Sequence, residues 1–211
     1  MTKDGRSDEA RDATAVAIED LGRRAFAPVH RAMLELAGSI QRGEGSGKVW
    51  LVEHDSVLTA GRATPKDELG EGVVSIERGG RVTWHGPGQL VIYPIVRLPQ
   101  RDAGAWLRAL ERFGVDVCAS FGLTATASDD GTGVFVAGRK LASIGVALRR
   151  WVNLHGIAIN VDVAPDAFAG IRPCGRSPDL MSDLSRALAR KVTLDECKAA
   201  ARKALPRLLG L

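Results

Sequence analysis

Residues 133–161 read GVFVAGRKLASIGVALRRWVNLHGIAINV, and this stretch decides the fold class. It contains three short apolar runs, at 134–136, 141–148 and 157–161, which are typical of β-strands. Ala137 and Gly138 separate the first two runs and mark a turn. We therefore expect this part of the chain to form a sheet.

Outside this stretch, the spacing of apolar residues predicts helices. Spacings of three and four residues extend over 24–41, 102–122 and 193–205. The third helix begins with a capping box formed by Thr193 and Glu196, and we expect it to stop before Pro206. Three helices are therefore expected to flank the sheet.

Further strands are expected in the first half of the chain, at the Val- and Leu-rich segments 48–53, 56–59 and 73–77. Strands and helices do not alternate strictly, which argues against a doubly wound fold. The predicted fold class is α/β of the α+β type, with a mixed, largely antiparallel sheet flanked by helices.

Length and composition favour one globular domain. The chain has 211 residues, of which 45% are hydrophobic and 26% charged. We expect residues 1–22 to be a loosely attached lead-in and residues 23–211 to form a single catalytic domain. No apolar stretch approaches the roughly 20 residues of a membrane span, and no secretory signal is evident, so a cytoplasmic protein is expected.

The charged residues and the cysteines narrow the function classes. Residues 1–20 carry a net charge of −3 and residues 21–211 a net charge of +7, with no basic run of five or more. Dispersed bases argue against nucleic-acid binding.

The three cysteines are an odd number without close pairing, which suits free thiols. We expect Cys118 and Cys197, within predicted helices, to be structural.

Residues 78–89, RGGRVTWHGPGQ, are the densest candidate site. Four glycines and a proline in twelve residues specify an unusual backbone that a ligand can approach closely. A wall of a binding site is one interpretation. A tight hairpin carrying an isolated histidine is the other.

Three further segments carry candidate chemical groups: 138–145 with Lys140, 153–161 with His155, and 171–175 with Cys174. A lysine heading an apolar strand often extends to water, and a histidine before a glycine is often structural. Cys174 lies between a proline and a glycine, where its thiol could be exposed and reactive.

These four segments, with Glu53-His54 and Gly61-Arg62, resemble the lipoyl(octanoyl) transferases. Members of that family are octanoyl-acyl carrier protein:protein octanoyltransferases, related in fold to biotin and lipoate protein ligases. The resemblance covers roughly residues 21–175. The chain departs from it at Trp84, where tyrosine is expected, and at 176–184, where relatives are glycine-rich.

The resemblance implies roles for individual residues. Cys174 corresponds to the acyl-accepting nucleophile, and Lys140, 34 residues earlier, to its catalytic partner. The implied acyl-substrate pocket comprises Arg78, Gly79, Gly80, Arg81, Val82, Thr83, Trp84, His85, Ser143, Ile144, Gly145, Gly156, Ile157 and Ala158. His85 and His155 are candidates for orienting the reacting groups. Backbone N–H groups near Gly175 and of Gly79 and Gly80 are candidates for an oxyanion hole.

The implied reaction is the first step of endogenous protein lipoylation. Octanoyl-acyl carrier protein, whose acyl group is a phosphopantetheine thioester, donates octanoyl through a cysteine thioester to a lysine of a lipoyl domain. The expected acceptors are lipoyl domains of 2-oxoacid dehydrogenase complexes and the glycine cleavage H protein. Neither a nucleic acid nor a membrane is an expected partner.

No cofactor is expected for this reaction. Exchange between thioesters is nearly isoenergetic and needs no ATP. The four histidines lie far apart in sequence, so no metal is expected either. The alternatives are an ATP-dependent lipoate or biotin protein ligase and a non-catalytic carrier-protein-binding module. The presence of both Cys174 and Lys140 argues against the module.

Overall fold

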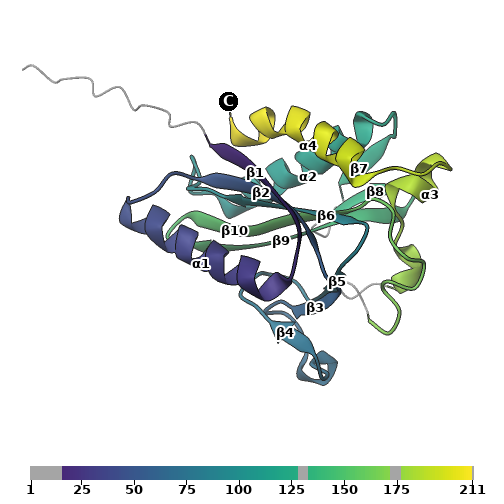
Figure 1. Ribbon diagram of the computed structural model, residues 1–211, viewed down its shortest axis with the longest axis horizontal. Helices are drawn as coiled ribbons and strands as arrows, with labels where there is room; N and C mark the ends of the chain where they lie inside the picture. Colours follow the sequence, from purple (N-terminus) through teal and green to yellow (C-terminus); the bar gives the residue numbers. More distant parts are fainter. Residues whose placement is uncertain (1–15, 128–132, 172–176, 211) are drawn as a thin grey trace, which may run out of the picture.

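A mixed sheet forms the centre of the molecule. The computed structural model describes residues 16–127, 133–171 and 177–210. Within these ranges, seven strands pair in the order β1-β2-β6-β10-β9-β8-β7 (Figure 1). The strands are β1 (Ala17–Arg24), β2 (Lys48–His54), β6 (Gln89–Ile95), β7 (Ala125–Ala127), β8 (Gly133–Val136), β9 (Arg139–Arg149) and β10 (Val152–Asn160). β1 and β2 are parallel and the other neighbours are antiparallel, which confirms the predicted largely antiparallel sheet.

Helices cover both faces of this sheet, as predicted (Figure 1). The helix α1 (Phe26–Arg42) packs on β6 and β10, and its buried side chains include Phe26, Val29 and Met33. The helices α2 (Ala103–Ala119) and α4 (Leu194–Leu209) pack against each other over the opposite face. A short helix, α3 (Leu184–Leu188), precedes α4. Two apolar cores result, one on each face of the sheet.

A second, smaller sheet lies beside the main one. It has the order β4-β3-β5 and consists of β3 (Val57–Ala60), β4 (Val73–Ser75) and β5 (Val82–His85). β3 and β5 are antiparallel, with Thr59 paired to Thr83. The loop from β4 to β5 carries the glycine-rich segment, which this arrangement brings towards β9: the Gly79 N–H donates to the Val146 carbonyl oxygen across 2.9 Å.

Two sequence-based boundaries were wrong. The lead-in does not extend to residue 22, because β1 pairs with β2 from Ala17 onward, where parallel hydrogen bonds hold the strand. The last helix does not stop before Pro206 but continues through it to Leu209. Leu208 is buried in the core there, and the contacts of this last turn outweigh the hydrogen bond that proline cannot donate.

The two cysteines predicted to be structural are buried free thiols. Cys118 lies on α2 and Cys197 on α4, and burial raises the pKa of Cys118 to about 12. Both thiols are therefore protonated at neutral pH. Among the helices of the described ranges, none is long and apolar enough to cross a membrane.

Candidate active site

A cavity lies where the small sheet meets the main sheet. Its volume is about 30 Å³, enough for one or two water molecules. Its lining contains ten of the residues named from the sequence: Arg78, Thr83, His85, Ser143, Ile144, Gly145, His155, Gly156, Ile157 and Ala158. Three segments that are distant in sequence, 78–85, 143–145 and 155–158, therefore meet at one apolar cavity with a few polar groups.

Alternation along β5 decides which of its residues face the cavity. Thr83 and His85 line it, whereas Val82 and Trp84 point the other way, as neighbours on a strand must. The Trp84 indole donates from Nε1 to Ser56 Oγ across 2.9 Å, and its ring packs edge-on against Phe168. Val82 and Trp84, which the resemblance placed in the acyl-substrate pocket, therefore do not line the cavity.

The aromatic wall comes from two residues that sequence reasoning missed. Phe26 at the start of α1 and Tyr93 on β6 both line the cavity. Phe26 belongs to the predicted buried face of its helix, but periodicity alone could not show that this face borders a cavity. No motif marked Tyr93.

Arg78 braces the glycine-rich loop. Its Nη1 donates to the carbonyl oxygens of Gly79 and Arg81, and its Nη2 donates to the carbonyl and hydroxyl oxygens of Thr59. The Arg78 side chain packs against Gly145 on β9, where a Cβ would come within 2.9 Å of Arg78 Cδ. A glycine is therefore needed at position 145 for this arginine to line the cavity.

The rest of the glycine-rich segment supports the loop without lining the cavity. Gly80 has a φ of 79°, the left-handed conformation that favours glycine. Arg81 forms an ion pair with Glu68. The Gly79 N–H is already bonded to Val146, so it is not free to serve the oxyanion hole proposed from the sequence.

All four histidines of the chain gather around the cavity, despite their distance in sequence. His30 stacks on His155 with ring centroids 5.5 Å apart, and His54 contacts His85 at 6.3 Å. His54 Nε2 also lies 3.0 Å from the Tyr93 hydroxyl. Separation in sequence was therefore a poor reason to treat the histidines as independent.

His85 is neutral at physiological pH. Burial lowers its pKa to about 3, against the opposing effect of its hydrogen bond with Gln89. His85 Nδ1 lies 2.7 Å from Gln89 Oε1. Because Nδ1–H donates to Gln89 Oε1, Nε2 of the neutral ring carries a lone pair and can only accept a hydrogen bond from a group in the cavity.

Lys140 is buried at the start of β9 and does not extend to water. Its side chain is only 2% exposed and packs over Gly133, where a Cβ would collide with the lysine Cε. Its Nζ lies 6.0 Å from the centre of the Phe135 ring. Lys140 is three residues from Ser143, which lines the cavity. Of the two interpretations of this lysine, the structure supports an inward-facing side chain.

Cys174 lies outside the described residues, which end at Ile171 and resume at Ser177. The segment that follows is tied to the lysine strand. Met181 forms a parallel bridge with Lys140, and the Ser182 N–H donates to the Lys140 carbonyl oxygen across 2.9 Å. The chain leaving the proposed nucleophile is thus fixed beside the proposed base.

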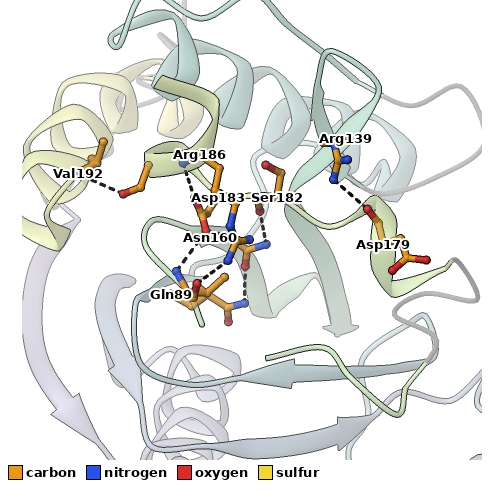
Figure 2. Close-up of polar contacts among 10 residues, drawn as sticks. Gln89, Arg139, Asn160, Asp179, Ser182, Asp183, Arg186 and Val192 are labelled. Carbon is orange, nitrogen blue, oxygen red and sulfur yellow. Dashed lines mark hydrogen bonds and ion pairs between the residues drawn. The ribbon is translucent and has the colours of Figure 1, made fainter. Parts of the chain in front are cut away.

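A buried polar network connects this segment to the cavity. Figure 2 shows Asn160 between Gln89 and Ser182: its Oδ1 accepts from Gln89 Nε2 and its Nδ2 donates to the Ser182 carbonyl, both across 2.9 Å. Gln89 in turn contacts His85. The neighbouring Asp183 caps α3 by accepting from the Arg186 N–H. These bonds join the cavity wall to the segment after Cys174.

Comparison with known proteins assigns this arrangement to a family. Residues 30–206 match the model of the lipoyl protein ligase A/B catalytic domain. An octanoyltransferase of Nocardia farcinica (strain IFM 10152) is 42% identical over 197 residues, covering 89% of this chain and 79% of that protein. An octanoyltransferase of Salinispora tropica is 39% identical over 208 residues, covering 94% and 96%.

Solved structures share the fold at low sequence identity. A bi-partite lipoate protein ligase from Thermoplasma acidophilum, studied with its E2 lipoyl domain, aligns with a TM-score of 0.69 at 15% identity, covering 92% of this chain and 84% of that chain. A biotin protein ligase from Aquifex aeolicus, in complex with biotin and ATP, aligns with a TM-score of 0.56 at 11% identity, covering 92% and 70%. The fold is that of the lipoate and biotin protein ligases, and the chain belongs to the lipoyl protein ligase A/B catalytic domain family.

Proposed function

We propose that this protein is an octanoyltransferase that moves octanoyl from octanoyl-acyl carrier protein to a lysine of a lipoyl domain, through a thioester on Cys174. The relatives named octanoyltransferase, which match over most of the chain, support the activity. The single structural observation that carries the mechanism is the buried Lys140, whose backbone holds the segment that follows Cys174.

The first half of the proposed reaction exchanges one thioester for another. Lys140 takes the proton of the Cys174 thiol, and the thiolate attacks the octanoyl carbonyl carbon. When the tetrahedral intermediate collapses, the bond to the phosphopantetheine sulfur breaks and Lys140 returns the proton to that sulfur. The energy of the donor thioester is retained on the enzyme, so this step needs neither ATP nor a metal.

The second half converts the thioester to an amide. The acceptor lysine amine attacks the carbonyl carbon of the acylated Cys174, Lys140 accepts the proton that the amine loses, and the proton then passes to the departing cysteine sulfur. The apolar lining beside Ser143 and Ile144 suits the octanoyl chain, and the cavity, at about 30 Å³, would have to widen to hold all of it. The proposed acceptors are lipoyl domains of 2-oxoacid dehydrogenase complexes and the glycine cleavage H protein. A structural relative studied with an E2 lipoyl domain supports an acceptor of this kind.

The test is transfer to a purified lipoyl domain, followed by mass spectrometry. With octanoyl-acyl carrier protein and no ATP, we expect one octanoyl group on the domain, and none with Cys174→Ser. Acylation that requires free octanoate and ATP would instead identify a ligase. Binding of acyl carrier protein without any transfer would identify a non-catalytic module.

A further inference from the structure

His30, Glu77 and His155 come together at the edge of the cavity, although they belong to three distant parts of the chain. His30 lies on α1, Glu77 follows β4, and His155 lies on β10. One ligand atom from each residue lies within 4.8 Å of the other two. The proposed transfer uses neither His30 nor Glu77.

Two distances within this group are close to those of a metal site. His30 Nε2 and His155 Nε2 each lie 3.4 Å from the same carboxylate oxygen, Glu77 Oε1, and His30 Nε2 also lies 3.1 Å from Glu77 Oε2. In a tetrahedral zinc site with metal-ligand distances of about 2.0–2.1 Å, neighbouring ligand atoms are ~3.3 Å apart. Two histidines and one glutamate are also a ligand set that zinc uses in proteins, with the fourth position taken by water.

His155 supplies an independent observation. Its side chain is 3% exposed, and within the described residues its buried Nε2 has no hydrogen bond of normal geometry. The residue also has a φ of 62°, a left-handed conformation that is unusual for a histidine within a strand. Strained backbone and an unsatisfied buried nitrogen both cost free energy, and such features cluster at ligand sites.

Arg78 is the neighbouring charge that opposes a cation, since its positive charge acts on His155. Its guanidinium donates to four oxygens of Thr59, Gly79 and Arg81, which offset part of that charge. The Glu77 carboxylate is in direct contact with both imidazoles and is the nearer counter-charge. We propose that His30, Glu77 and His155 form a binding site for a divalent transition metal, with zinc as the ion that fits this ligand set.

Cobalt(II) titration of the full chain, after treatment with a chelator, tests this site. Cobalt(II) can replace zinc in such sites, and it absorbs visible light when its nitrogen and oxygen ligands are few in number. We expect a saturable d–d absorption band at one cobalt per chain, which zinc abolishes by competition. Glu77→Gln should weaken cobalt binding by more than about tenfold, because even loss of a group that only supports a ligand costs 10–100-fold. The matched control is Glu71→Gln, which removes the same charge from an exposed position.

Two further variants keep the test decisive. His30→Phe removes a ligand but retains a ring to stack on Phe26 and His155, so it should fold even if Glu77→Gln does not. Cys174→Ser should bind cobalt like the unmodified chain. No saturable band, undiminished binding in a folded Glu77→Gln or His30→Phe variant, or loss of binding in Cys174→Ser would each overturn the proposal. Transfer of octanoyl by the metal-free enzyme is a separate measurement and tests only the proposed function.

Discussion

The backbone N–H of Ser182 donates to the carbonyl oxygen of Lys140 across 2.9 Å. This bond joins the segment that follows Cys174 to the start of β9. Because Asn160 binds the Ser182 carbonyl from the other side, Ser182 is held between the lysine strand and the centre of the sheet. The position of the chain after the proposed nucleophile thus depends on buried polar contacts.

The first prediction concerns this network. Asn160→Ala removes the hydrogen bonds to Gln89 and Ser182 and leaves buried polar groups without partners. We expect it to lower the free energy of unfolding by about 2–3 kcal/mol, measured by urea denaturation. Ser177→Ala, which removes an exposed contact with Asp179, is the control and should change stability by less than ~0.5 kcal/mol. Equal stabilities of the two variants would contradict a structural role for the network.

The second prediction concerns the close packing at Gly156. A Cβ at this position would lie 2.2 Å from the Ile92 carbonyl oxygen, so β10 would have to separate from β6. We expect Gly156→Ala to cost more than ~3 kcal/mol of stability. Gly138→Ala is the comparison, because Gly138 has a φ of 75° but open space around it. Strain alone should cost that variant about 1–2 kcal/mol, and thermal unfolding of both would show the difference.

Sequence periodicity predicted the elements but not how they meet. The spacing of Phe26, Val29 and Met33 was enough to place α1, because one apolar face needs a core wherever that core lies. The cavity depends on contacts between β5, β9 and β10, which no local pattern contains. The alternation within β5 could have shown that Trp84 and His85 face opposite ways, had that strand been recognised.

The group of His30, Glu77 and His155 also could not be predicted from local sequence patterns. His30 and His155 are 125 residues apart, and Glu77 was read only as the end of an expected strand. Their proximity follows from α1 packing on β10, which is a tertiary contact.

The end of α4 also depends on tertiary contacts. Pro206 favours the end of a helix, but burial of Leu208 outweighs that tendency here.

The third prediction is a loss of stability in mild acid. The pKa of His85 is about 3 in the folded protein, below its ordinary value of 6.5, so the unfolded chain binds a proton that the folded chain does not. The contribution of His85 to the free energy of unfolding is therefore fully present above pH 6.5 and is lost as the pH falls towards 3. Between pH 6 and 5, His85 alone should remove about 1 kcal/mol.

Urea denaturation at pH 6 and pH 5 measures this loss. His85→Gln, which cannot titrate, should reduce the pH dependence by about 1 kcal/mol over that unit. This interval lies above pH 4.5, where Glu77 is largely ionised in both the folded and the unfolded chain, so Glu77 contributes little to the change of stability with pH. An unchanged pH dependence in the variant would show that His85 is not held neutral.

The fourth prediction concerns Lys140 as the proton acceptor. Lys140→Met fills a similar space without an amine, and we expect it to slow alkylation of Cys174 by iodoacetamide near neutral pH, with the rate profile moving to higher pH. Lys140→Arg should keep some thiolate but should not restore turnover, because a guanidinium does not accept a proton at this pH. Wild-type turnover in the arginine variant would remove Lys140 from the proton transfer and favour a cavity histidine instead.

Intact-mass spectrometry of the enzyme after incubation with octanoyl-acyl carrier protein, without ATP and without acceptor, tests the central claim most directly. We predict an increase by the mass of one octanoyl group, mapped to Cys174 by peptide analysis and removed by hydroxylamine, which cleaves thioesters. Cys118 and Cys197 should stay unmodified, because both are buried and protonated. An adduct that maps to Cys118 or Cys197, or that forms only when ATP is added, would contradict a cysteine-thioester transferase acting through Cys174.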